Sequence, residues 1–241
     1  EAASIIQRGE ADIILTGGDE APLQPVFYAG FNAMKALATA DNPIQAVKPF
    51  DLDRNGFILG EGSAMLILEE LEHAKQRGAH IYAELSAAAT SADAFDMVAA
   101  SGEGIAHAMR AALSQADLTP EDIGYINAHG TGTPLNDRVE TQAIKEVFKE
   151  SAYKLAVSST KGATGHMMGA AGAVEAALTI MAVKDQELPP TLNYMNSDPD
   201  CDLDYVPNIS RPVEIDHAMS TSVGLGGHNS AIILSKWMND V

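Results

Sequence analysis

Short apolar runs of strand length alternate with helical segments along most of this chain, and this alternation constrains the fold more than any other feature. Residues 123–127 and 155–158 are such runs, and helices are expected to begin at Pro134 and Gly169. A strand, a crossover helix and a second parallel strand form a right-handed unit. The sequence therefore predicts an α/β fold with a mostly parallel sheet.

The first eighty residues follow a less regular pattern. The expected elements are a helix at 1–7, a strand at 11–15 buried on both faces, a helix at 31–38, strand runs at 56–60 and 64–68, and a helix at 69–77. The polar residues 61–63 between the two strand runs indicate a turn or bulge within one strand, or a hairpin. The chain lacks an initial methionine and begins within the first helix, so we expect a fragment of a longer protein.

The second part of the chain opens with a strand at 81–85. Ile105, Met109, Ala112 and Leu113 fall on one face of a helix, and runs at 220–224 and 231–234 are expected to close the sheet. The candidate catalytic motifs all follow strand ends, which is where ligands of open α/β sheets bind.

Charge and composition exclude several classes of partner. A formal net charge of −18 repels phosphate backbones and anionic lipid, so we expect neither nucleic acid nor a membrane surface as partner. The single cysteine excludes an internal disulfide, no zinc-ligand spacing is found, and no complete nucleotide-binding motif indicates a cofactor. No signal peptide or membrane-spanning run is present. We expect a cytoplasmic protein, or a plastid or mitochondrial one in a eukaryote.

Two histidines stand in glycine-rich stretches after strand ends. His129 precedes Gly130-Thr131-Gly132-Thr133, and His166 closes the stretch that begins at Ser159. Each imidazole either faces a ligand or is satisfied by carbonyl groups of its own loop, and the two interpretations are equally supported for each residue alone. Metal binding by the pair ranks lower because no third ligand has a recognisable spacing.

A lysine and an acid accompany the second histidine. Lys161 is either a solvated side chain or a functional one. Glu175 is the one acid in the apolar helix 169–181, and a buried acid needs a cationic partner, for which Lys161 is the nearest candidate.

Two further features have competing interpretations. Gly224-Leu225-Gly226-Gly227 is either a simple turn or a source of backbone N–H groups for an oxyanion hole. Cys201 is flanked by acids that should raise the pKa of its thiol, so a nucleophile there is not expected.

Taken together and in order, residues 127–133, 157–175, 188–193 and 226–229 closely resemble the β-ketoacyl-acyl-carrier-protein synthases of the elongating type, most of all synthase II. Residues 51–74 match the same family. The resemblance covers essentially the whole chain.

The resemblance implies a layered αβαβα thiolase fold, with helices buried between two sheets, of which this chain is the C-terminal portion. Residues 1–80 would complete the N-terminal half, and residues 81–241 would form the C-terminal half. It also implies a homodimer and an acyl carrier protein as partner. The nucleophilic cysteine of the family would lie just before residue 1, so the chain alone should be inactive.

The resemblance further implies an acyltransferase that joins malonyl-carrier protein to an enzyme-bound acyl thioester by decarboxylative Claisen condensation, with no cofactor or metal. The residues it assigns are His129, His166 and Lys161 as catalytic groups, Glu175 as their support, Leu225 and Gly226 at the oxyanion hole or gate, and Thr131, Thr133 and Val223 in the substrate pocket. Elongating enzymes usually carry phenylalanine at the positions of Val223 and Leu225, so acyl-chain gating is expected to differ here.

A non-catalytic partner subunit resembling chain-length factors is the alternative function. Retention of both histidines and of Lys161 favours the catalyst.

Overall fold

A five-stranded mixed sheet forms the centre of the molecule in a computed structural model, which describes residues 1–238. The strands are β1 (Ile13–Glu20), β2 (Gly62–Glu69), β3 (Glu84–Ala92), β4 (Ile123–Asn127), β5 (Ala156–Ser158), β6 (Glu187–Leu188), β7 (Arg211–Pro212), β8 (His217–Gly224) and β9 (His228–Ser235). The longer helices are α1 (Ala2–Gln7), α2 (Pro25–Ala33), α3 (Leu71–Gln76), α4 (Gly102–Ala116), α5 (Pro134–Phe148) and α7 (Ala171–Asp185). The four-residue α6 (Lys161–Thr164) and the 3₁₀ turn η4 (Met168–Ala170) precede α7.

The strand order of the central sheet is β3-β9-β8-β4-β5. β4 pairs in parallel with β5 and β8, whereas β9 pairs antiparallel with both β8 and β3. The sheet is therefore mixed: the predicted parallel pairing holds for β8, β4 and β5, whereas β9 runs against both of its neighbours. Gly226 and Gly227 adopt positive φ in the short turn between β8 and β9, and a tight turn joins only antiparallel neighbours.

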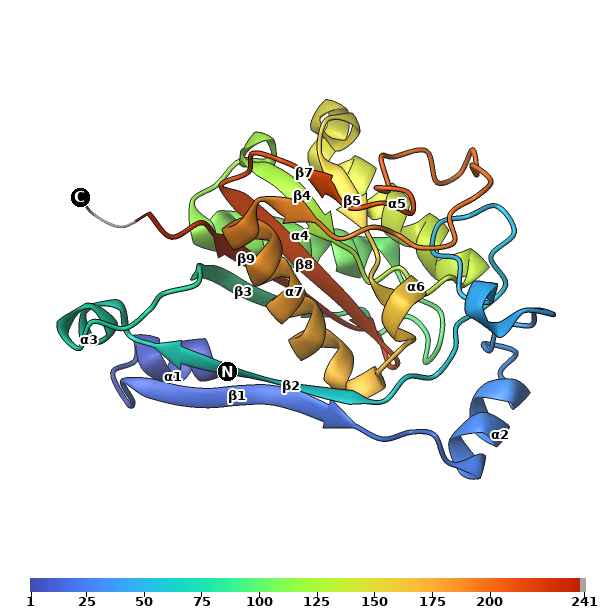
Figure 1. Cartoon of the computed structure of the whole chain (residues 1–241), viewed down its shortest axis with the longest axis horizontal. Coiled ribbons are helices and arrows are strands. Elements are labelled where there is room, and N and C mark those ends of the chain that lie inside the picture. Colours follow the sequence, from blue (N-terminus) through green and yellow to red (C-terminus); the bar gives the residue numbers. More distant parts are fainter. Residues whose placement is uncertain (239–241) are drawn as a thin grey trace.

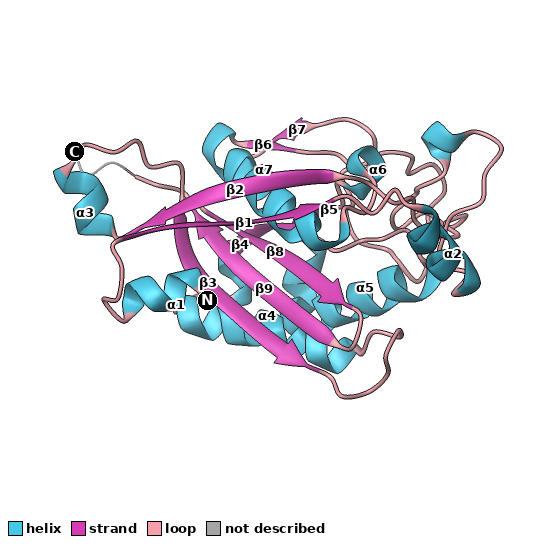
Figure 2. Ribbon diagram, turned by 90° about the horizontal axis from the view of Figure 1, so that it is seen from below, coloured by secondary structure: helices cyan, strands magenta, loops and turns pink. Residues whose placement is uncertain are grey.

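Helices cover both faces of this sheet. α4 packs on β3 and β9 and contacts α5, while α7 lies between β8 and a two-stranded ribbon made of β1 and β2 (Figure 1). Figure 2 shows the central strands seen from the ribbon side, with α4 and α5 behind them.

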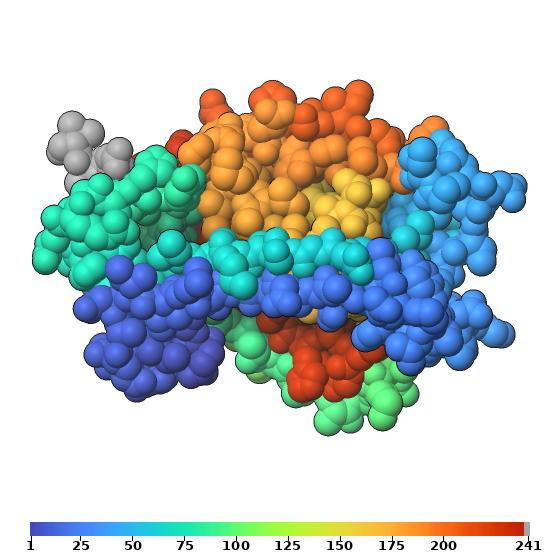
Figure 3. Space-filling model, turned by 60° about the horizontal axis from the view of Figure 1, so that its bottom comes forward, coloured from blue at the N-terminus to red at the C-terminus, as the bar shows by residue number. Residues whose placement is uncertain are grey.

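The predicted strand at 11–15 differs most from the structure. β1 runs to Glu20 and pairs antiparallel with β2, and its burial alternates, with Leu15 67% exposed. The two strands cross one face of the molecule as a surface ribbon (Figure 3). Gly17 and Gly18 lie within β1. A Cβ at Gly18 would lie 2.4 Å from the Gly169 carbonyl oxygen, so the glycine permits close approach of the two backbones.

Two other predicted elements are displaced. The helix expected at 31–38 is α2, which starts at Pro25 because proline suits the first helical turn; Ala36 and Ala38 instead hydrogen-bond with Phe57. The strand expected at 81–85 is β3, which starts at Glu84. The runs at 56–60 and 64–68 do not form a hairpin, since only the second becomes a regular strand, β2.

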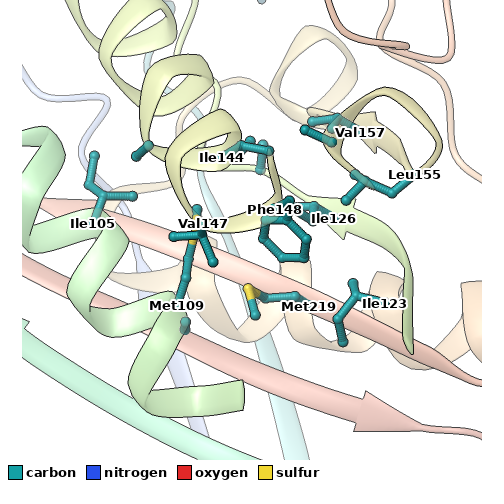
Figure 4. Packing of buried hydrophobic residues seen from close by; sticks show 14 of the residues in the cluster. Ile105, Met109, Ile123, Ile126, Ile144, Val147, Phe148, Leu155, Val157 and Met219 are labelled. Carbon is teal, nitrogen blue, oxygen red and sulfur yellow. The ribbon is translucent and has the colours of Figure 1, made fainter. Parts of the chain in front are cut away.

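The main core lies between the central sheet and the pair α4 and α5. The predicted stripe of α4 is fully buried, and α5 buries Ala143, Val147 and Phe148 on the same core. Figure 4 shows Met109 of α4 and Val147 and Phe148 of α5 near Ile126 and Met219 of the sheet. In residues 1–238, no helix is both long and apolar enough to cross a membrane.

Candidate active site

The two histidine stretches come together at one edge of the central sheet. β4 ends at Asn127 and β5 at Ser158, and these residues are paired in register. Because the strands are parallel, the loops that follow them leave the same edge of the sheet. His129 follows β4, while Lys161 begins α6 after β5, so the prediction that both motifs follow strand ends is confirmed.

The imidazoles of His129 and His166 are neighbours. Their ring centroids lie 5.3 Å apart in an edge-to-face arrangement with an interplanar angle of 80°. Burial, followed by the positive charge of Lys161, lowers the pKa of His129 well below 6.5 and the pKa of His166 to about 3. Both rings are therefore neutral at physiological pH.

Their hydrogen bonds define which ring nitrogen carries the proton. The Nζ atom of Lys161 lies 3.4 Å from Nδ1 of His129, and the backbone N–H of Met168 donates to Nδ1 of His166 at 3.1 Å. A lysine ammonium and a backbone N–H only donate, so each Nδ1 must accept. Each neutral ring then carries its proton on Nε2 and has an N–H donor available for a further partner.

Lys161 is buried, with 1% of its surface exposed, so the interpretation as a solvated lysine was wrong. Its ammonium pairs with Glu175 of α7 and donates to the His129 carbonyl oxygen at 2.5 Å. The expected partnership of Lys161 and Glu175 is thus confirmed. Burial raises the pKa of Glu175, and the charge of Lys161 opposes this effect.

Sequence reasoning missed Glu140, a completely buried acid of α5 that holds the first histidine loop. Its carboxylate accepts the backbone N–H groups of His129 and Gly130, both at 2.8 Å, and the hydroxyl of Thr221 at 2.8 Å. The signal was present in the sequence, because Glu140 shares a helix face with Ile144 and Val147 at spacings of four and seven residues.

Sequence reasoning also missed the segment that holds His166. Ile58 accepts the backbone N–H of His166 at 2.7 Å, and the N–H of Gly60 donates to the His166 carbonyl at 2.9 Å. The Phe57 ring meets the imidazole edge-to-face at 5.1 Å. No local pattern reveals these contacts, since about a hundred residues separate the partners.

The remaining predicted residues lie in two places. Thr131 is buried and its Oγ1 lies 2.8 Å from that of Thr133, within the first histidine loop. Val223 packs against the main core, whereas Leu225 is 53% exposed. The Gly226 N–H donates to the Met97 carbonyl, which ties the β8–β9 turn to the loop before α4.

Cys201 is buried in the main core. The pKa of its thiol is raised to about 11, chiefly by burial, with the charges of Asp137 and Asp198 adding to the effect. The sequence prediction that the pKa of this thiol is raised is confirmed. Burial, however, contributes more to the increase than the flanking acids to which the prediction attributed it. Within residues 1–238, no group of three or more His, Cys, Asp or Glu side chains is arranged to hold a metal ion.

Comparison with family models identifies two matching regions. Residues 1–74 match the model of the beta-ketoacyl synthase N-terminal domain, and residues 82–195 match that of the beta-ketoacyl synthase C-terminal domain.

Curated relatives match along nearly the whole chain. It is 46% identical over 239 residues to a 3-oxoacyl-[acyl-carrier-protein] synthase 2 of Staphylococcus aureus (strain COL), which covers 98% of this chain and 58% of the relative. It is 48% identical over 240 residues to the protein of the same name from Synechocystis sp., with the same two shares. The chain thus spans somewhat over half the length of these relatives.

Solved structures give the same result for the fold. A type II polyketide synthase ketosynthase, solved in complex with its acyl-carrier protein, has a TM-score of 0.96 and 42% identity over 98% of this chain and 59% of its own. A beta-ketoacyl synthase from Burkholderia phymatum STM815 has a TM-score of 0.94 and 38% identity over 98% and 58%. The ishigamide ketosynthase/chain length factor has a TM-score of 0.91 and 38% identity, over 98% of this chain and 57% of its own length. The chain belongs to the β-ketoacyl synthase family and has the α/β fold of its thiolase-like members.

Proposed function

We propose that this chain is the C-terminal portion of an acyltransferase that performs decarboxylative Claisen condensation. In this reaction, malonyl-carrier protein loses CO₂, and the resulting enolate attacks an enzyme-bound acyl thioester in fatty-acid or polyketide synthesis. Residues 1–80 and 81–241 would belong to the two halves of the complete, dimeric enzyme. The names of the relatives support this assignment.

The observation that carries the proposal is the pair of neutral imidazoles, His129 and His166, each with its proton on Nε2. Decarboxylation develops negative charge on the thioester oxygen of the malonyl group, and two N–H donors at that oxygen stabilise the enolate. Preorganised donors of this kind are each worth ~2.7–4 kcal/mol of barrier. In each neutral ring Nδ1 accepts a hydrogen bond, so the single ring N–H, on Nε2, is the group that can donate to that oxygen.

In this proposal Lys161 acts through His129. Its ammonium keeps Nδ1 of His129 in the accepting role and adds a fixed positive charge close to the oxygen that becomes negative. Glu175 balances that charge within the buried site and holds the ammonium in place. Burial excludes water, which strengthens each of these interactions.

Acyl transfer needs a thiolate, and the raised pKa of Cys201 argues against this residue. We assign the acyl acceptor to the cysteine that the family resemblance implies before residue 1. Thr131, Thr133 and Val223 would contact the substrate, and the backbone at Leu225 and Gly226 would bind the acyl thioester oxygen.

A condensation assay tests the assignment and separates it from the chain-length-factor alternative, which the name of one structural neighbour raises. The enzyme that contains this chain is mixed with acyl- and malonyl-carrier protein, and the carrier-bound product is measured by mass spectrometry. We expect a 3-oxoacyl product two carbons longer than the primer. A product that forms only after a separate ketosynthase is added would instead identify a partner subunit.

A further inference from the structure

Arg54 is a buried cation that the proposed mechanism does not use. It lies between α2 and β2, with 5% of its side chain exposed. Its Nη1 donates to the Asp51 carbonyl at 2.8 Å and pairs with Asp198 at 2.5 Å, while Nη2 and Nε donate to the Pro134 and Thr133 carbonyls at 3.1 and 3.4 Å. One guanidinium therefore joins three segments that are far apart in sequence, and one of them leads directly out of the first histidine loop.

The same guanidinium faces the carboxylate that holds the end of that loop. Asp137, completely buried in the first turn of α5, accepts the N–H of Gly132 at 3.1 Å and that of Phe50 at 2.8 Å. Nε of Arg54 lies 3.8 Å from this carboxylate. Burial raises the pKa of Asp137 to about 6, and the charge of Arg54 works against that increase.

The segment that carries Arg54 also forms a wall of the histidine loop. The Phe50 ring stacks on Tyr205 at 4.1 Å, and a Cβ added to Gly130 would lie only 2.8 Å from that ring. The Gly56 N–H donates to the Gly132 carbonyl at 2.9 Å. The loop is thus fixed on one side by α5 and on the other by residues 50–56.

We propose that Arg54 is a positioning residue for His129: its guanidinium fastens segment 50–56 and the start of α5 around loop 129–133, and thereby sets the position of the imidazole. The inference deepens the proposed function and rests on it for its meaning. The contact it protects is Lys161 Nζ to His129 Nδ1, whose 3.4 Å length is near the limit of a hydrogen bond. A small displacement of the loop is enough to break this hydrogen bond. His129 can then carry its proton on either ring nitrogen.

The test reads the tautomer directly in the 241-residue chain, by NMR of ¹⁵N-labelled histidine side chains. The parent should show an unprotonated Nδ1 and a protonated Nε2 for His129. In Arg54→Gln, we expect more than half of the molecules to lose that pattern. Arg110→Gln is the matched control, because it removes an arginine paired with Glu146 on the exposed surface, and it should keep the parent pattern.

Arg54→Lys provides a second variant that retains the charge but not the planar fork of donors. Loss of the His129 pattern in both variants, or in Arg54→Gln alone, supports positioning by Arg54. The parent pattern in both folded variants overturns the proposal, and so does failure of Arg54→Lys to fold, since the arginine would then serve the fold as a whole. The readout involves no condensation, so a parent that lacks condensing activity refutes the proposed function without deciding this point.

Discussion

Acidification from pH 6.5 to pH 5 should destabilise this chain through His166, and the structure sets the size of the effect. The folded chain keeps this imidazole neutral over that range because its pKa is lowered to about 3, whereas the unfolded chain protonates it near 6.5. The unfolded state then binds more protons, so the free energy of unfolding decreases as the pH falls. At about 1.4 kcal/mol for each pH unit, His166 accounts for a loss of up to about 2 kcal/mol at pH 5.

Urea unfolding of the parent and of His166→Asn at pH 7 and pH 5 measures this loss. The asparagine amide oxygen can accept the Met168 N–H in place of Nδ1 but does not titrate, so the variant should lose up to about 2 kcal/mol less than the parent. His107→Asn changes an exposed histidine of α4 and should behave like the parent. Equal losses in the parent and in His166→Asn would refute the reasoning that the folded site excludes a proton.

Three further predictions concern the rest of the site. Lys161→Met should destabilise the fold by about 3–5 kcal/mol by leaving Glu175 buried and unpaired; in urea unfolding, Lys161→Met/Glu175→Gln should cost less than the sum of the single changes, and strict additivity would mean that the two do not interact. Leu225→Phe should narrow the range of acyl primers accepted in a competition assay, and identical primer profiles would remove the gating argument. Incubation of the chain with labelled acyl-carrier protein should give no adduct at Cys201 by intact mass, and stoichiometric acylation there would contradict the assignment of the acceptor.

Local patterns predicted the elements that carry the histidines. β4 spans the predicted residues 123–127, and α4 buries the predicted stripe that contains Ile105 and Met109, because burial on one face leaves a periodic trace in the sequence. The ion pair of Lys161 with Glu175 could also be predicted, since an acid alone on an apolar helix requires a cation.

Other parts of the structure depend on contacts that leave no periodic trace. The antiparallel pairing of β1 with β2 was missed because an apolar run such as 13–15 is compatible with either strand direction. The anchoring of the first histidine loop was missed because its partners are distant: the Phe50 N–H and the Asp137 carboxylate are 87 residues apart. Arg54 likewise stands in a polar loop whose sequence resembles an exposed one, although tertiary contacts bury it.

The most direct test of the central claim is the release of CO₂ from malonyl-carrier protein by the enzyme that contains this chain. This step precedes carbon–carbon bond formation and depends on the two Nε2–H donors, so it isolates them from acyl transfer. We expect His129→Ala and His166→Ala each to reduce CO₂ release by about 10²–10³-fold, while acyl transfer to the enzyme persists. Near-normal release in either variant would contradict the assignment of that imidazole to the enolate.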